Sequence, residues 1–378
     1  MTAAVLAGIF DSQIGRLPNA SYLGLSARCV TGALADAGIA MERLDGLIVT
    51  ESQVAYYNRP AGALAEYLGV SEQLHYAGGS PLGGATPFSG VAEAVRLVDS
   101  GICDVVAIVM ADIPRTGQSR TTSVDQFAAM RDTDYEVPFG LSNAAAYALL
   151  AAAYQAEFNS SDGERAAVAT AQRRYAVTHP GALYTDVLTT EDVLTSRIIA
   201  SPLHLVECRP IADGGAAVVV CRSEITERTP VVLTGWGFGM VYDQVNQIHE
   251  PWRTGSYLSS ARAYERAGIT SASTAFDVAL LYDSYTIAVL LELEGLGITP
   301  VGSAGRFVAE GGISQSGSLP TNTHGGLLSH GGPGICHITE AVRQLRGEAA
   351  NQVAGVRRAV VHGEGGIISA NLTLVLEV

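Results

Sequence analysis

The chain has 378 residues, of which 48% are hydrophobic and 16% charged, and it contains 42 glycines. This composition is typical of a large, well-packed globular protein with many tight turns, and it excludes a disordered chain. The formal net charge of -14 argues against nucleic acid or an anionic membrane as the main partner, although a local basic patch for a phosphorylated ligand is compatible with it.

The five cysteines form no pattern typical of disulfides or metal binding. Their number is odd, and they are scattered as Cys29, Cys103, Cys208, Cys221 and Cys336. We therefore expect neither a disulfide framework nor a metal site. The first residues lack the basic and apolar regions of a signal peptide, and no uninterrupted apolar run has membrane-spanning length. These features predict a soluble, cytoplasmic protein.

The first part of the chain alternates short apolar runs with amphipathic segments. We predict strands at Ala3–Ile9, Leu44–Thr50 and Val105–Met110, and helices at Ser21–Ala37 and Pro87–Asp99. Strands that alternate with helices predict a mostly parallel sheet with helices on its faces.

The next segment, residues 114–199, reads as a helical insertion. It opens with a polar, turn-rich stretch and continues with predicted helices at Asn143–Phe158 and Arg165–Ala176. The chain then returns through the turn Asp213–Gly215 into an apolar strand, Ala216–Cys221. Residues 200–228 therefore complete the unit that residues 1–113 begin.

The second half, residues 229–378, repeats the order of the first. Each copy has a helix, a glycine stop, a short loop and an aspartate before a buried strand. Such echoes arise in any protein of this class, but the shared order of three elements favours an internal duplication. The paired segments are Ser26–Arg28 with Ser260–Arg262, Ala37–Ile39 with Ala267–Ile269, and Asp45 with Asp277.

Several motifs in a fixed order identify a resemblance to a known family. They are Ser201–Ala217, Asp277–Thr286, Glu292–Gly297, Asn322–Gly326 and Gln344–Gly347. In this order they resemble the thiolase superfamily, and in particular its sterol-carrier-protein-type branch, which includes aldolases. The resemblance implies an α/β, thiolase-like fold in which two duplicated halves form a layered αβαβα core, with a helical insertion in the first half.

The family's reactive cysteine lies at the start of a buried helix, where the helix dipole favours the thiolate. That position corresponds here to Gly84, so no cysteine is present. Ser80, Thr86 and Ser89 offer nearby hydroxyls. They are either substitute nucleophiles or, as we favour, helix-capping residues beside glycines that leave room for substrate. We expect Gly84, Ser89 and, in the later turns, Gly332 and Gly365 to bind substrate, and Cys103 to lie in the core.

The resemblance also implies two further acid/base positions. The family's G-H-P histidine corresponds to Gly332, with His330 and His337 close enough in sequence to point back into the site. The family's second cysteine corresponds to His362, which could act as acid, base or oxyanion donor. His324 lies in the glycine turn Asn322–Gly326. For each histidine the alternative is a structural side chain in a turn.

Tyr282 takes the place of an asparagine that thiolases use in the oxyanion site, and it matches a tyrosine of the family's aldolases. A tyrosine acts as acid or base when its environment shifts its pKa. The aldolases' second tyrosine falls at Gly332 and is missing. The alternative for Tyr282 is a half-buried strand aromatic.

These residues together predict carbon–carbon bond cleavage or formation on an acyl-CoA, aldolase-like on a β-hydroxyacyl-CoA, with Tyr282, His362, His324 and His330 as catalytic residues. Two alternatives are a thiolase-type acyltransferase and a non-catalytic acyl-CoA-binding or scaffold subunit. We expect no permanently bound cofactor, since coenzyme A enters as part of the substrate. The resemblance further implies a homodimer and a small OB-fold partner protein.

Overall fold

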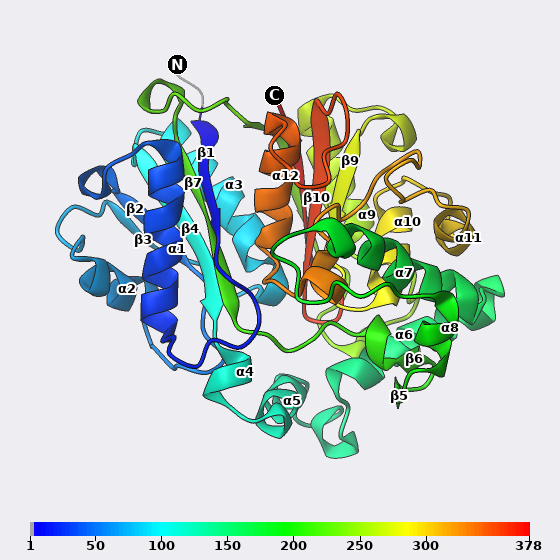
Figure 1. Ribbon diagram of the computed structural model, residues 1–378. Coiled ribbons are helices and arrows are strands. Elements are labelled where there is room, and N and C mark those ends of the chain that lie inside the picture. Colours follow the sequence, from blue (N-terminus) through cyan, green and yellow to red (C-terminus); the bar gives the residue numbers. More distant parts are fainter. Residues whose placement is uncertain (1–3) are drawn as a thin grey trace.

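The computed structural model describes residues 4–378, and two central helices separate its two main sheets. Helices α3 (Thr86–Asp99) and α12 (Cys336–Arg346) run side by side between the sheets, in cyan and orange in Figure 1. The inward faces of both sheets and these two helices share one large apolar core. Residues at the ends of the central helices can therefore meet residues from both halves of the chain.

The first sheet has five strands and mixes both directions. The N-terminal strand forms one edge, and the strand that returns after the insertion lies between it and the next strand, antiparallel to both. In spatial order the strands are β1 (Ala4–Asp11), β7 (Gly214–Arg222), β4 (Val105–Asp112), β2 (Gly46–Val49) and β3 (Tyr76–Gly78).

The second sheet has four strands and ends the chain with an antiparallel hairpin. In spatial order it contains β8 (Val232–Gly239), β11 (Ala370–Glu377), β10 (Arg358–Gly365) and β9 (Val278–Leu281). Strands β9 and β10 are parallel, with His362 paired to Leu281.

The expectation of a mostly parallel sheet is wrong. Two of four pairings in the first sheet and two of three in the second are antiparallel. The reason is that β7 and β11 return to the sheets from loops rather than from crossover helices, and such strands can enter antiparallel.

Helices cover the outer face of each sheet. On the first sheet these are α1 (Tyr22–Ala37) and α2 (Pro60–Leu68), and on the second α9 (Ser256–Ala267) and α10 (Thr286–Gly295), with the short α11 (Ala304–Ala309) beside α10 (Figure 1). The layers thus follow the order αβαβα, which confirms the predicted fold class.

The two halves repeat one local device. Helices α1 and α9 both end at a left-handed glycine, Gly38 with φ of 70° and Gly268 with φ of 67°. After each, an aspartate side chain accepts backbone N–H groups at the start of the neighbouring strand: Asp45 from Val105 at 2.9 Å, and Asp277 from Arg358 at 2.9 Å. The same solution at the same point in both halves supports the internal duplication.

The segment between β4 and β7 is helical and packs across one end of the molecule (Figure 1). The domain bounds given above stay a prediction. The segment contains α4 (Pro114–Gly117), α5 (Arg120–Ala129), α6 (Asn143–Phe158), α7 (Asp162–Thr178), α8 (Thr190–Thr195) and the small pair β5 (Ile198–Ala200) and β6 (Leu203–His204).

Most predicted elements agree with the structure to within a few residues. Asn143–Phe158 matches in full, and Ser21 caps α1 by accepting a hydrogen bond from the backbone of Gly24. The predicted start of the first strand at Ala3 lies outside the described residues. None of the helices within residues 4–378 is both long and apolar enough to cross a bilayer.

A buried ion pair joins the insertion to the returning segment of the first half, which in turn contacts the second half. Arg165 on α7 donates from Nε to Glu207 Oε1 over 2.6 Å, and both residues are almost fully buried. Glu207 also accepts a hydrogen bond of 3.0 Å from Thr286, at the start of α10.

We expect Arg165→Met to lower the free energy of unfolding by about 3–5 kcal/mol, because it leaves the Glu207 carboxylate buried without its cation. Arg96→Met is the control, because Arg96 forms an exposed pair with Glu93, and its loss should cost no more than about 0.5 kcal/mol. Urea unfolding followed by circular dichroism measures both, and equal stability of the two variants would contradict the prediction.

Candidate active site

Tyr282 directly follows β9 and lies where the two halves meet. Its ring is buried, with a relative exposure of 6%, and packs against Phe88 of α3 at a centroid distance of 6.4 Å. Two glycines enclose it: a Cβ at Gly84 would overlap the tyrosine hydroxyl, and a Cβ at Gly334 would overlap the ring edge. Only glycine at both positions makes room for this aromatic ring.

Arg209 supplies the charge next to Tyr282. It follows the cis-proline turn of the returning segment and donates from Nη1 to the Tyr282 hydroxyl over 3.3 Å. Burial raises the pKa of the Tyr282 phenol, and the Arg209 guanidinium opposes that increase. Tyr282 is therefore a phenol at neutral pH, and its phenolate, once formed, has a cation beside it.

Gly84 and Gly365 come together at this point, as two adjoining backbone turns. A Cβ at Gly365 would overlap the carbonyl oxygen of Leu82, in the turn that leads into α3. Thr86 accepts a hydrogen bond of 3.0 Å from the backbone of Leu82, so its hydroxyl stabilises the turn. This is the structural role favoured for the hydroxyl residues before the helix.

Four histidines form a row that leads from the surface to Tyr282. The neighbouring ring centroids are 5.0 Å apart for His179 and His330, 5.1 Å for His330 and His324, and 4.9 Å for His324 and His337. The last ring lies 6.1 Å from the ring of Tyr282. We call these four residues the histidine row.

The side chains of the histidine row are less exposed to solvent toward its inner end. His179 is half-buried after α7, whereas His330, His324 and His337 are 3%, 2% and 0% exposed. Burial lowers the pKa of His330 to about 4 and that of His324 well below its usual range. At neutral pH these two rings are uncharged, so each carries one N–H and one bare nitrogen. Among residues 4–378, no group of histidines, cysteines or carboxylates converges in a way that would hold a metal ion.

Asp283 fixes the local geometry beside the inner end of the row. Its carboxylate accepts the backbone N–H groups of Leu327 at 2.8 Å and Leu328 at 3.0 Å, which begin the π-helical turn Gly326–His330. His337 Nε2 lies 3.3 Å from Asp283 Oδ1 but outside hydrogen-bond geometry. The aspartate thus positions the turn that carries His330.

A second buried acid lies on the other side of β10. Glu364 Oε1 accepts hydrogen bonds of 2.6 Å from Tyr147 in the insertion and 2.6 Å from Ser284. Burial raises the pKa of Glu364 to about 7. Its backbone carbonyl also lies against Gly84. This end of β10 therefore limits the space at Gly84 and places a titratable carboxyl group nearby.

The placement expected for His362 is wrong. Side chains alternate between the two faces of a strand, and His362 is paired with Leu281, one residue before Tyr282. It therefore points to the sheet face opposite Tyr282, where it is fully buried and lies 2.9 Å from the Thr373 hydroxyl and 3.3 Å from that of Ser256. These polar contacts have a structural role, because they join the second sheet to α9.

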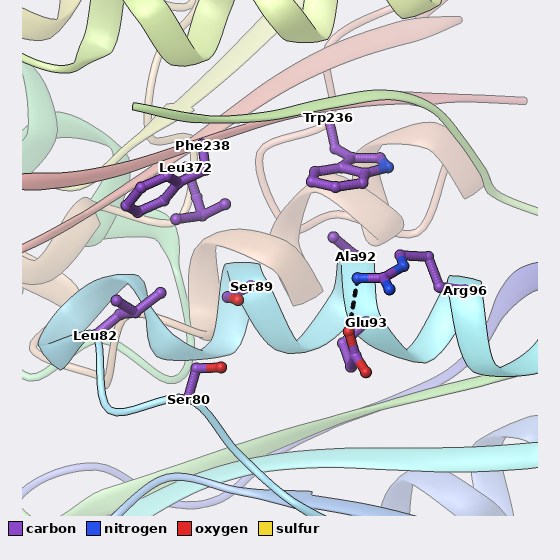
Figure 2. Close-up of a pocket in the computed structure, with 9 residues that line it drawn as sticks. All are labelled: Ser80, Leu82, Ser89, Ala92, Glu93, Arg96, Trp236, Phe238 and Leu372. Carbon is purple, nitrogen blue, oxygen red and sulfur yellow. Dashed lines mark hydrogen bonds and ion pairs between the residues drawn. The ribbon is translucent and has the colours of Figure 1, made fainter. Parts of the chain in front are cut away.

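Two predicted substrate-binding residues also lie away from Tyr282. A Cβ at Gly332 would approach His330 Nδ1 and Cys336 Sγ at 2.8 Å each, so Gly332 gives space to the histidine row. Ser89 lines a surface pocket of about 280 Å³ between α3 and the second sheet. Figure 2 shows Trp236, Phe238 and Leu372 facing α3 across this pocket.

The structure brings Tyr282, His324 and His330 into one region, and their catalytic role stays a prediction. Sequence reasoning assigned no role to Arg209, Gly334 or Glu364. Arg209 lies within the quoted motif Ser201–Ala217, so a cation in that segment was the available signal. Gly334 and Glu364 carried no signal, because their importance comes from contacts with residues distant in sequence.

Comparisons with known proteins identify relatives along the whole chain. The family described as "Thiolase C-terminal domain-like" matches residues 239–378. The chain is 34% identical, over 98% of both chains, to 17-hydroxy-3-oxo-4-pregnene-20-carboxyl-CoA lyase of Mycobacterium tuberculosis. It is 32% identical, over 98% of its length and 97% of the relative's, to a steroid side-chain-cleaving aldolase of Thermomonospora curvata.

A solved structure is similar along the whole chain. The Ltp2-ChsH2(DUF35) aldolase superposes with a TM-score of 0.87 at 30% identity and covers 99% of this chain and 97% of the other. The fold is thus that of a thiolase-like protein whose centre holds a tyrosine. The chain belongs to the thiolase superfamily, in the sterol-carrier-protein-type branch that includes aldolases.

The fit of Tyr282 against Gly84 predicts the cost of any added side chain. Gly84→Ala should lower the free energy of unfolding by about 1–3 kcal/mol, because the new methyl group must displace the tyrosine or the strand carbonyl of Glu364. Ser89→Ala, on the pocket-facing side of α3, should change stability by no more than about 0.5 kcal/mol. A Gly84→Ala protein as stable as the wild type in urea would contradict the fit.

The buried neutral histidines predict a loss of stability in acid. The folded-state pKa of His362 is lowered to about 4 from an ordinary value near 6.5. As the pH falls, His362 is protonated in the unfolded chain before it is protonated in the folded protein. Its contribution to the free energy of unfolding is therefore fully present above pH 6.5 and is lost as the pH falls toward 4. Each such histidine contributes a slope of about 1.4 kcal/mol per pH unit.

Between pH 6 and pH 4.5 the unfolding free energy of His362→Gln should decrease less than that of the wild type. The difference should equal the contribution of one buried histidine. The exposed His249 provides the control, since His249→Gln should leave the slope unchanged. Urea unfolding across this pH range measures the difference, and parallel curves for all three proteins would show that His362 is already charged in the folded state.

Proposed function

We propose that this protein is an acyl-CoA carbon–carbon lyase that cleaves a β-hydroxyacyl-CoA by a retro-aldol reaction. The observation that carries the proposal is the Tyr282 hydroxyl in the space that a side chain at Gly84 would need. Where the resemblance places a nucleophilic cysteine, this site has the hydroxyl of Tyr282, a group that can transfer a proton. The similarity to two relatives named as a lyase and an aldolase supports the same chemistry.

Tyr282 can perform both proton transfers of such a reaction. Its phenolate, held beside Arg209, takes the proton of the substrate β-hydroxyl. The oxygen then forms the carbonyl of the released ketone or aldehyde, the bond between the α and β carbons breaks, and its electron pair forms the thioester enolate. Tyr282 returns the proton to the α carbon and becomes a phenolate again. The second tyrosine of the family's aldolases is then not required.

The cysteines of this chain do not fit an acyltransferase. Burial raises the pKa of Cys29 to about 12 and that of Cys336 well above its usual range, so neither is a thiolate at neutral pH. The other three cysteines have pKa values raised by burial to about 11 or 12: Cys103, Cys208 and Cys221. A covalent acyl-enzyme on sulfur is therefore disfavoured throughout the described chain.

The proposal extends to the substrate and the assembly. One relative's name combines a steroid hydroxyl with a CoA-linked carboxyl group, and we propose a bulky, steroid-like β-hydroxyacyl group for this chain. The Ltp2-ChsH2(DUF35) aldolase carries two components in its name, which supports a partner protein. We propose that this partner is a small OB-fold protein beside a homodimer of this chain. Coenzyme A enters and leaves with the substrate, so no resident cofactor is part of the proposed reaction.

Tyr282→Phe tests the proposal. It should lower kcat for release of ketone or aldehyde from a β-hydroxyacyl-CoA by about 10²–10⁴-fold with little change in KM, because it removes the proton-transfer group but keeps the ring. Tyr264→Phe, which removes a hydroxyl bonded at 2.9 Å to the Leu296 carbonyl, should leave kcat unchanged.

The assay uses a panel of steroidal and straight-chain β-hydroxyacyl-CoAs, with and without a co-purified partner, and mass spectrometry of the intact protein. A stable acyl adduct would instead identify an acyltransferase. Thermal stabilisation by acyl-CoA without any turnover would identify a binding or scaffold subunit, and either result would overturn the proposed reaction.

A further inference from the structure

The histidine row has no role in the reaction as written so far. Tyr282 transfers its proton only between two substrate atoms, and the row reaches from its ring to the surface at His179. Its three inner rings are buried among charged or polar groups from several elements, with Asp283 at the inner end and the Asp11–Arg343 pair, at 2.6 Å, toward the outer end. Burying three imidazoles in one line has a cost in solvation that packing alone would avoid with apolar residues.

Neighbouring rings of this row meet edge to face, at interplanar angles of 84°, 61° and 85°, and few protein groups satisfy their buried ring nitrogens. Within the described chain, five of them have no hydrogen-bond partner: both nitrogens of His324, both of His337 and Nδ1 of His330. Buried polar groups without a protein partner are rare, and they are usually bridged by ordered water or serve a functional purpose. Centroid spacings near 5 Å are short enough for one bridging water between neighbouring rings.

Tyr282 needs a route for its proton. It rests as a phenol, yet the proposed reaction starts from the phenolate, so a proton must leave the buried site. Arg209 cannot accept a proton, and the Asp283 carboxylate already accepts two backbone N–H groups. The Glu364 carboxyl group is held by hydrogen bonds from Tyr147 and Ser284. The imidazole of His337, at the inner end of the row, is then the proton acceptor next to the Tyr282 ring.

We propose that the histidine row conducts protons between solvent at His179 and the hydroxyl of Tyr282. This inference rests on the proposed function. The phenol proton passes to His337, each imidazole accepts on one nitrogen and releases from the other, and His179 releases a proton to water. The phenolate that remains is balanced by the Arg209 guanidinium. A proton that returns along the row restores both the phenol and the original tautomers.

The row has a measurable consequence that is separate from cleavage. In D₂O the Tyr282 phenolate can remove an α proton from an acyl-CoA and return it. When the row exchanges that proton for a deuteron first, deuterium appears at the α carbon. Cleavage itself transfers a proton from the β oxygen to the α carbon within the site, so steady-state cleavage does not need the row.

The experiment measures deuterium wash-in to acetyl-, propionyl- and butyryl-CoA by mass spectrometry, alongside kcat for cleavage. We expect His324→Gln and His330→Gln to lower wash-in at least about tenfold while cleavage changes by less than about threefold. The matched control is His362→Gln, which replaces an equally buried histidine outside the row and should leave both rates within about twofold.

The outcomes separate the two proposals. Wash-in and cleavage that fall in proportion in the row variants, or wash-in that does not change, would overturn the relay while leaving the lyase in place. Wild-type cleavage without any wash-in would also overturn the relay. A wild-type protein that neither cleaves nor exchanges would overturn the lyase and the relay together.

Discussion

The position of the Tyr282 ring depends on a steric constraint that involves both halves of the chain. Gly84 comes from the first half, and Tyr282 and Gly334 come from the second, with the would-be Cβ of Gly334 only 3.5 Å from the Gly84 carbonyl oxygen. The ring therefore fits only when α3 and α12 are held at their present separation, which the shared central core provides. Packing at native density makes such a position intolerant of even one added methyl group. The constraint that closes the core therefore also sets the space around the Tyr282 hydroxyl.

Burial then determines the charge state of the site at rest. It raises the pKa of Tyr282 and lowers that of His324 and His330, so acid and bases are all neutral at pH 7. Arg209 is the fixed cation next to the tyrosine. A neutral acid beside a fixed positive charge is poised to lose its proton at a modest cost, because the resulting anion is already compensated. The fold thus controls reactivity mainly through desolvation.

Local sequence patterns predicted the helices, the glycine stops and the duplication well, because caps such as Ser21 and stops such as Gly38 act within a few residues. The sheet directions were not predictable, because β7 pairs with β1 across some two hundred residues and nothing near either strand specifies the direction. For the site, the aligned turns drew attention to Tyr282 and His324, and the structure places His337 between their rings. His362 points to the face of the sheet opposite Tyr282, because it is paired with the residue before the tyrosine. An alignment of loops does not determine which face a strand residue occupies, whereas the strand pairing does.

A side chain at Gly84, near where the resemblance places the family's cysteine, and the buried Tyr282 ring compete for the same space. A cysteine at Gly84 would need the volume that the Tyr282 hydroxyl occupies, so the chain can hold one group or the other but not both. The histidine at the family's G-H-P position is absent in the same way, because Gly332 gives its space to His330. At both glycines, where the resemblance places a side chain, an ionisable residue of this chain occupies the space: Tyr282 at Gly84 and His330 at Gly332. A site that had simply lost its function would have no reason to keep these replacements buried, aligned and next to an arginine, since unpaired buried polar groups cost stability.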